Sequence, residues 1–311
     1  MRKLHALVAG CLVGLVSSAA VAAPPVPLLW KVSDGDNALY LLGSFHMLKP
    51  TDYPLSPDVA SAVEDAESVL FEISPEEMNS PALAADMMQA ALRTDGSTLD
   101  GEIGPDLAAR LDAWSDALPA GSMMNADVLQ RFEPWFAGLT ISILQMTTMG
   151  LDPALGLDRH FMDLAAEAGK PVGGLETAAQ QIALFDGMDP GEQVQMLADA
   201  LDDAAAGTAK LDEMHADWRA GRADALWDGM AAEMREEYPA LYQRINVDRN
   251  EAWLPALAAR LDAPGDDDTL VVVGALHLLG EDGVVAGLRE RGYTVERICS
   301  ACEAEATTPA P

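Results

Sequence analysis

Residues 37–50 read NALYLLGSFHMLKP, and this stretch decides the fold. Its apolar run Leu39–Leu42 has the length and composition of a buried strand, and Gly-Ser-Phe-His46 follows at once. The same pattern returns near the other end of the chain, where the run 269–273 (TLVVV) leads into Gly-Ala-Leu-His277. Histidine titrates close to physiological pH and is the commonest metal ligand. Because two of only five histidines occupy equivalent places in this repeat, we predict a functional site there.

The other strands that we expect are also short, and they alternate with helical segments. They lie at 29–32, 68–73, 170–175 and 293–298. Strands that are apolar throughout, with helices between them, indicate a largely parallel sheet covered on both faces. We therefore predict a single α/β domain over residues 23–302, with a mostly parallel central sheet flanked by helices. It contains two related β-GxxH halves and a helical insertion at 190–240.

Four polar side chains fall at or just after the ends of predicted strands. They are His46, Glu72, Glu176 and His277. In parallel sheets, ligands bind beyond the carboxyl ends of the strands. We expect these side chains to share one cleft.

A carboxylate inside the apolar run SVLFEI is costly to bury unless it is paired, which makes Glu72 unusual. Arg249 could pair bidentately with Glu72 or with a carboxylate on the substrate, or it could form an ordinary surface ion pair. Glu176 could orient a ligand or cap the helix that follows it.

Two histidines and a carboxylate can hold a divalent cation that keeps a position open for water. The same residues can act without metal, with one histidine taking a proton from water. They could also be core histidines bonded to backbone. We interpret His160 as a helix-surface or structural residue and His215, in an acidic helix, as solvated. The sequence contains no serine nucleophile elbow, phosphate-binding loop or dinucleotide fingerprint.

Residues 1–22 have the pattern of a secretory signal peptide, with a basic start, an apolar stretch and small residues before a cleavage site. We prefer ordinary cleavage to lipidation at Cys11, because few apolar residues precede that cysteine. No later run approaches the roughly 18 apolar residues that a membrane span requires, so no stable membrane insertion is expected after cleavage. The sequence thus predicts a periplasmic or secreted protein, and residues 303–311 are predicted to be a disordered tail.

The formal net charge of −31 argues against binding to nucleic acid, which requires clustered lysine and arginine. It also disfavours binding to anionic lipid. Cys299 and Cys302 form a CxxC motif after the last predicted strand. We interpret the pair as a structural disulfide in an oxidising compartment, in preference to a redox or zinc motif.

Several segments of this sequence resemble the TraB/PrgY/GumN family, which includes the Tiki metalloproteases and is related to erythromycin esterase and ChaN-like proteins. The segments are GSFH at 43–46, FEI at 71–73, GLD at 156–158, KPVGGLET at 170–177, NVDRN at 246–250 and VVGALHLLGEDGVVAGLRERGYTV at 272–295. The resemblance implies an α/β domain and, in the Tiki branch, metal-dependent hydrolysis at GxxH histidines and an acidic residue. Carried over, it implies His46, His277 and Glu72 as the site, with Arg249 and Asn250 nearby.

The hypothesis that follows is a secreted or periplasmic hydrolase, a peptidase or amidase that depends on a divalent cation of the Mn, Co or Zn type. Its substrate would be a peptide or a small molecule. The expected metal ligands are His46, Glu72 and His277, and the expected catalytic residues are Glu72, Glu176, Arg249 and Asn250. One alternative is a metal-free, esterase-like hydrolase, and another is a non-catalytic protein that binds a metal, haem or peptide. The sequence predicts no oligomeric state.

Overall fold

The computed structural model describes residues 23–119 and 122–302 of the chain. The predicted signal peptide at 1–22 and the predicted tail at 303–311 lie outside these residues. Across the described part, no helix has the length and apolar character that crossing a membrane requires.

Within the described residues, six strands form one mixed sheet in the order β4-β3-β5-β2-β1-β6. Their bounds are β1 (Leu29–Ser33), β2 (Ala38–Ser44), β3 (Ser68–Ile73), β4 (Val172–Glu176), β5 (Thr269–Gly274) and β6 (Thr294–Arg297). The four strands from β4 to β2 are parallel, whereas β1 pairs antiparallel with both β2 and β6. The predicted α/β fold with a mostly parallel sheet is confirmed.

The two strands that precede the GxxH histidines are direct neighbours. β2 and β5 pair in parallel, with Gly43 opposite Val273 and Ser44 opposite Gly274. Every residue of β2 is buried, as is every residue of β5 except its last. Strands in the middle of a parallel sheet are covered on both faces, which explains their continuous apolar runs. This pairing brings both histidines to the same edge of the sheet.

One apolar core surrounds the sheet. The helices that pack there are α1 (Pro57–Asp65), α7 (Leu157–Ala168), α14 (Asp248–Leu261) and α15 (Val284–Glu290). Phe161 of α7, Trp253 of α14 and Leu288 of α15 are each almost completely buried in this core. These aromatic and aliphatic side chains provide the main hydrophobic stabilisation of the sheet layer.

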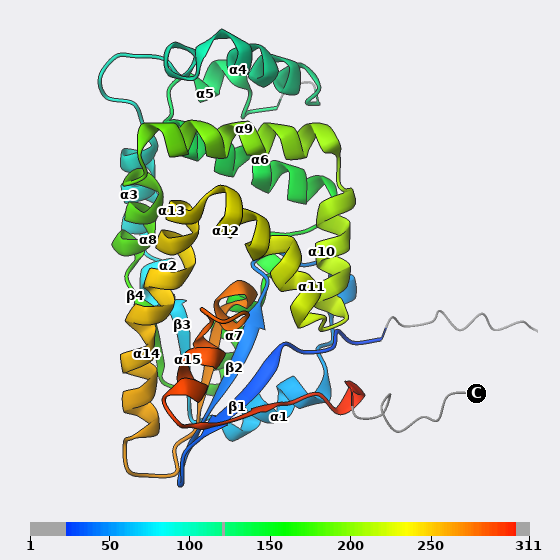
Figure 1. The fold of residues 1–311 in the computed structure, drawn as a ribbon, viewed down its shortest axis with the longest axis vertical. Coiled ribbons are helices and arrows are strands. Elements are labelled where there is room, and N and C mark those ends of the chain that lie inside the picture. The colour runs from blue at the N-terminus through cyan, green and yellow to red at the C-terminus, as the bar shows by residue number, and fades with distance from the viewer. Residues whose placement is uncertain (1–22, 120–121, 303–311) are drawn as a thin grey trace, which may run out of the picture.

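A second apolar core lies within the helical part of the protein, beyond the carboxyl ends of the parallel strands (Figure 1). Its main helices are α3 (Pro81–Ala91), α4 (Leu99–Asp116), α5 (Ala126–Leu129), α6 (Pro134–Thr148) and α9 (Pro190–Ala206). Gly138 of α6 lets α9 approach closely, since a β-carbon there would lie 3.2 Å from backbone atoms of Leu197. Pro134 begins α6, at a position where proline is favoured.

The remaining helices connect the two cores. They are α2 (Pro75–Met78), α8 (Ala178–Asp186), α10 (Ala209–Arg219), α11 (Ala223–Trp227), α12 (Glu233–Glu237) and α13 (Pro239–Tyr242), with π-helical turns η3 (Asp228–Ala232) and η4 (Gln243–Val247). The 190–240 segment contributes to both cores, with Leu197 in the second and Trp218 and Leu226 in the first. The division into one domain with an insertion stays a prediction. Cys299 and Cys302 are joined by a disulfide at the end of the described chain.

The prediction for His215 is wrong, because this side chain is buried and its exposed fraction is only 7%. Its Nε2 lies 2.8 Å from Oδ2 of Asp52, a completely buried carboxylate that Arg219 also contacts. The ring of Trp218 stacks on the rings of both His215 and Phe45. A buried ionic cluster therefore fixes α10 to the loop that follows His46. The polar residues of this cluster are not part of an apolar repeat, so the sequence of α10 resembled that of a solvated helix.

Replacing Asp52 by asparagine is expected to lower the free energy of unfolding by about 3 kcal/mol near neutral pH, because His215 and Arg219 lose their buried anion. Burial alone raises the pKa of Asp52, but hydrogen bonds from His215, the Lys49 amide and Arg219 lower it below its ordinary value. The stabilisation is thus present above the carboxyl pKa of the unfolded chain, about 3.9, and is lost as the pH falls below it.

Urea unfolding of the wild-type and Asp52→Asn proteins between neutral pH and about pH 3 measures this difference. The difference in unfolding free energy between the wild type and Asp52→Asn should become smaller as the pH falls. Asp112→Asn, an exposed change on α4, is the matched control and should change stability little at any pH. A gap that stays constant into acid would contradict the ionic explanation.

Candidate functional site

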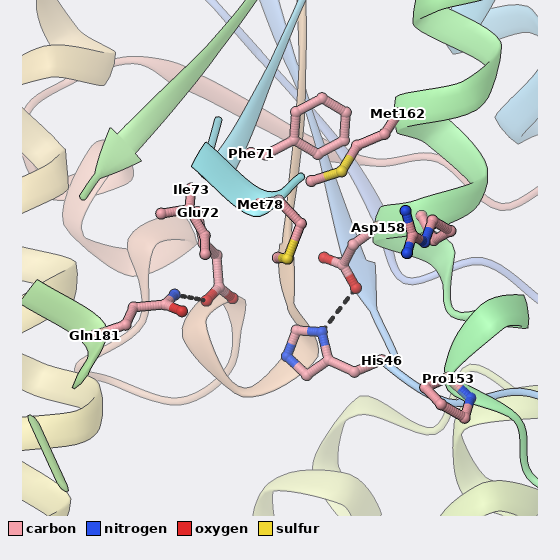
Figure 2. Close-up of a pocket in the computed structure, with 10 residues that line it drawn as sticks. His46, Phe71, Glu72, Ile73, Met78, Pro153, Asp158, Met162 and Gln181 are labelled. Carbon is pink, nitrogen blue, oxygen red and sulfur yellow. Dashed lines mark hydrogen bonds and ion pairs between the residues drawn. The ribbon is translucent and has the colours of Figure 1, made fainter. Parts of the chain in front are cut away.

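His46 follows β2, and its ring is held from one side. Nδ1 of His46 donates to Oδ2 of Asp158 at 2.7 Å (Figure 2). The hydroxyl of Ser44 donates to the same carboxylate. Asp158 raises the pKa of His46 to about 9, so the ring is protonated near pH 7. The His46 side chain is 65% exposed, and its Nε2 is left for a ligand.

Gly156 explains how Asp158 reaches this ring. A β-carbon at Gly156 would lie 2.2 Å from the carbonyl oxygen of His46, a distance that no side chain tolerates. Glycine therefore lets α7 begin directly against the loop after β2. Sequence analysis missed Asp158 as a site residue, although the GLD segment that contains it was part of the family resemblance.

His277 lies in the 3-10 turn η5 (Ala275–Leu278), directly after β5. Its Nδ1 donates to Oδ1 of Asn250 at 2.7 Å, and Nδ2 of Asn250 donates to the backbone carbonyl of Asp282. Nε2 of His277 consequently carries a lone pair, which accepts a hydrogen bond from Nη1 of Arg249 at 2.8 Å. Burial, together with the Arg249 charge, lowers the pKa of His277 to about 3, so the imidazole is neutral.

The two GxxH histidines are thus held in equivalent ways. Each uses Nδ1 to bind an oxygen from a neighbouring helix, Asp158 of α7 or Asn250 of α14, and each turns Nε2 towards the site. Fixing one ring nitrogen and freeing the other is how proteins orient metal-binding histidines. It also suits a histidine that transfers protons.

Glu72 is the second-to-last residue of β3, and its side chain is buried. Its Oε1 accepts the Gly274 amide at 2.7 Å, while Oε2 accepts from Gln181 at 3.0 Å and from Nη2 of Arg249 at 2.6 Å. Burial by itself raises the pKa of Glu72, but the charges of His277, Arg249 and His46 lower it to about 2. Glu72 is therefore a fully ionised carboxylate inside the protein.

Arg249 joins Glu72 to Glu176, the last residue of β4. Its Nε lies 3.1 Å from both Glu176 oxygens, and its Nη2 lies 2.6 Å from Oε1. The helix after β4 is capped instead by Thr177, so of the two roles considered for Glu176 the cap is excluded. Arg249 is likewise not part of a surface ion pair, since only 12% of its side chain is exposed.

All the side chains proposed from sequence come together around the end of β5. A β-carbon built on Gly274 would lie 3.2 Å from Oε1 of Glu72, 3.5 Å from Cδ2 of His277 and 3.7 Å from Nε2 of His46. Only glycine leaves this space open, and it is the point on which the three side chains converge. His160 is elsewhere, with its ring packed against Tyr53.

The donor atoms have the right chemistry for a divalent cation, since two ring nitrogens and one carboxylate suit Mn, Co or Zn. As the side chains stand, however, no group of three or more His, Cys, Asp and Glu residues in the described chain is arranged to hold a metal ion. The guanidinium of Arg249 contacts both Nε2 of His277 and Oε2 of Glu72, two of the atoms that would bind a cation. The residues therefore fit a cation only if Arg249 shifts towards Glu176.

Two cavities meet at the site. The first has a volume of about 380 Å³ and is apolar on one side, where Phe71, Ile73, Met78 and Met162 line it (Figure 2). The second has a volume of about 260 Å³ and reaches His277. Both cavities are lined by His46, Glu72 and Gln181, so the polar centre lies between them. Gln181 is a second residue that sequence analysis missed.

Comparison with known proteins finds one family and two relatives. The model of the TraB/PrgY/gumN family matches residues 28–297, a range that contains every residue of the site. The chain is 24% identical over 257 residues to the uncharacterized protein YbaP of Escherichia coli (strain K12), covering 82% of this chain and 89% of YbaP. The YbaP protein of Shigella flexneri matches with the same identity and coverage. No solved structure gives a significant match.

Proposed function

This chain belongs to the TraB/PrgY/gumN family, and from that premise we propose that it is a hydrolase that cleaves amide bonds in peptides or small molecules. The observation that carries the proposal is the convergence of His46, His277 and the ionised Glu72 on the space beside Gly274. The cavities on both sides of this centre offer room for a substrate. The signal-peptide pattern of residues 1–22 supports a periplasmic or secreted location.

In the proposed mechanism, His46, His277 and Glu72 are the residues that would hold a divalent cation of the Mn, Co or Zn type. When bound, such a cation lowers the pKa of a water molecule and polarises the scissile carbonyl. Asp158 and Asn250 keep the two rings oriented through Nδ1. Glu72 also keeps its bonds to the Gly274 amide and Gln181, which fix the carboxylate in place.

Arg249 also takes part in this mechanism. It gives up its contacts to His277 and Glu72 but retains Glu176, with which its Nε forms two contacts. From that position the guanidinium would stabilise the negative charge that develops on the carbonyl oxygen. Glu176 is thus a positioning residue for Arg249.

One observation favours a second candidate function, a hydrolase that works without metal. Arg249 already occupies the position next to Glu72 and His277 and supplies positive charge there. The Asp158–His46 pair also has the form of a base oriented by a carboxylate. In this alternative, His46 takes the proton of the attacking water once the ring has lost its own Nε2 proton, which a pKa of about 9 places at alkaline pH, and Arg249 stabilises the oxyanion without moving.

Metal removal distinguishes these functions. The protein is purified without chelator, its metal content is measured by elemental analysis, and hydrolysis of peptide and ester substrates is measured before and after chelation. The proposed enzyme should lose activity by about 10³-fold or more, because its nucleophile disappears, and should regain it with Mn²⁺, Co²⁺ or Zn²⁺.

The control is His160→Ala, which should keep the wild-type metal content. Hydrolysis that survives chelation supports the metal-free candidate. A protein that binds metal, haem or peptide through His46 and His277 but turns over no substrate is the non-catalytic binding protein instead.

A further inference from the structure

A third cavity lies within the helical part of the protein. Its volume is about 630 Å³, and it is lined by residues of α6, α8, α9, α10, α12 and α13 with the turns η3 and η4. Phe185 and Ile245 line both this cavity and the 260 Å³ cavity beside His277. The three cavities therefore follow one another, and the polar centre lies between the first and the third.

The first and third cavities differ in charge. Beyond the polar centre, the first is lined by apolar residues such as Phe71 and Met162, together with the guanidinium of Arg159. The third has the carboxylates of Asp199, Asp202, Asp203 and Glu237 and the amino group of Lys210 in its lining, and Asp202 also forms an ion pair with Arg110 at 2.5 Å. Three methionines add a flexible apolar surface there, namely Met196, Met230 and Met234. A segment that carries both positive charge and apolar groups is complementary to this lining.

Asn246 lies between these cavities and has a hydrogen-bonding group left over. It is fully buried in η4 and lines the middle cavity. Its Nδ2 donates to the hydroxyl of Tyr242, which itself donates to Asp282, so the amide orientation is determined. Among the described residues, Oδ1 of Asn246 has no partner. A buried acceptor without a partner is unfavourable, and a ligand N–H would satisfy it.

We propose that the substrate is an extended peptide cleaved within its chain, with a lysine or arginine bound in the third cavity and an apolar residue in the first. This inference rests on the proposed function. Oδ1 of Asn246 accepts a main-chain N–H between the two ends. In the reaction, water adds its oxygen to the scissile carbonyl carbon, the C–N bond breaks, and the leaving nitrogen takes the proton.

The test uses the full chain and peptides of about twelve residues, which span about 40 Å when extended. Both ends are blocked by acetylation and amidation. One peptide has an apolar residue followed by lysine, and matched peptides carry glutamate in place of lysine or serine in place of the apolar residue. We expect internal cleavage and a kcat/KM at least about tenfold higher for the apolar–lysine peptide, a preference that weakens as salt is added.

Two neighbouring glutamates provide a matched pair of variants. Glu236 and Glu237 are both exposed in α12, but only Glu237 lines the third cavity. Glu237→Lys should reduce the preference for the lysine peptide several-fold, whereas Glu236→Lys should leave it unchanged. Equal effects of the two variants would overturn the assignment of this cavity.

Asn246 is tested through the substrate. Each main-chain N–H of the peptide is replaced in turn by an ester oxygen. At one position this replacement should lower kcat/KM of the wild type about tenfold, which corresponds to the loss of one hydrogen bond of about 1.4 kcal/mol. In Asn246→Leu, the same replacement should have no effect. If every position behaves alike in both proteins, Asn246 does not bind the chain.

Binding separates failure of this inference from failure of the proposed function. Fluorescence anisotropy with labelled peptides and His46→Ala measures affinity without cleavage. Charge-dependent binding without hydrolysis in the wild type supports the peptide site and overturns the enzyme. Hydrolysis without charge preference, or restricted to unblocked peptides and small amides, supports the enzyme and overturns the peptide site. If the protein neither binds nor hydrolyses the peptides, the peptide site is overturned.

Discussion

Replacing His46 by alanine is expected to lower kcat/KM for hydrolysis by about 10³-fold or more while leaving the fold intact. The ring provides one of the two Nε2 atoms at the site, and no neighbouring side chain can take over that role. Its side chain is 65% exposed, so removing it creates no cavity in the core. Steady-state kinetics and thermal unfolding of the same preparation measure the two effects separately.

Three variants complete this experiment. His277→Ala should lose a similar factor, because it removes the second ring. Asp158→Asn should lose about 10- to 100-fold, as expected when a group that orients a catalytic histidine is changed. His160→Ala should retain activity, since that ring packs on Tyr53. A His46→Ala enzyme that hydrolyses substrate at the wild-type rate would rule out the proposed centre.

The second large effect concerns stability. Arg249→Met is expected to lower the free energy of unfolding by about 3–5 kcal/mol, the range for breaking a buried ion pair by removing one partner. The largely buried carboxylates of Glu72 and Glu176 would then lose the Arg249 guanidinium that both contact. The variant also loses the contact between the guanidinium and the Trp253 ring. Denaturant unfolding near neutral pH measures the loss.

Two controls test this explanation. Combining Arg249→Met with Glu176→Gln should recover part of the stability, because one uncompensated charge is removed. Arg244→Met breaks a more exposed ion pair with Glu192 and should cost about 1 kcal/mol or less. If Arg249→Met is no more damaging than Arg244→Met, the buried pairing contributes little.

The same variant informs on metal binding. If the cation binds where Arg249 now contacts His277 and Glu72, adding Mn²⁺ or Zn²⁺ should raise the unfolding midpoint of Arg249→Met more than that of the wild type. The reason is that the cation replaces the missing guanidinium charge. No shift in either protein would favour the metal-free candidate.

The fold class could be predicted because the buried strands leave a direct signature in sequence. Runs such as Leu39–Leu42 and 269–273 are apolar throughout, and in a parallel sheet such runs need cover on both faces. The rule that ligands bind at the carboxyl ends of parallel strands then brought His46, Glu72, Glu176 and His277 to one edge. The order of the strands did not follow, because pairing depends on contacts between segments far apart in the chain.

The polar partners were harder to predict. Asp158 stands beside Arg159 and His160 at the start of a helix, where three polar residues in a row resemble a solvated surface. Its role depends on Gly156, which brings α7 against the backbone of His46. Likewise, His215 meets Asp52 across a large separation in sequence. Hydrogen bonds between distant segments have no periodicity, so a single sequence does not disclose them.

The position of β5 determines when the centre can exist. This strand lies between β2 and β3, which precede it by most of the chain, and it brings both His277 and the Gly274 amide that binds Glu72. During synthesis from the N-terminus, His46 and Glu72 are complete long before the strand that joins them. Any fragment that stops short of residue 269 lacks His277 and the Gly274 amide, so the proposed activity requires the chain to be synthesised through β5.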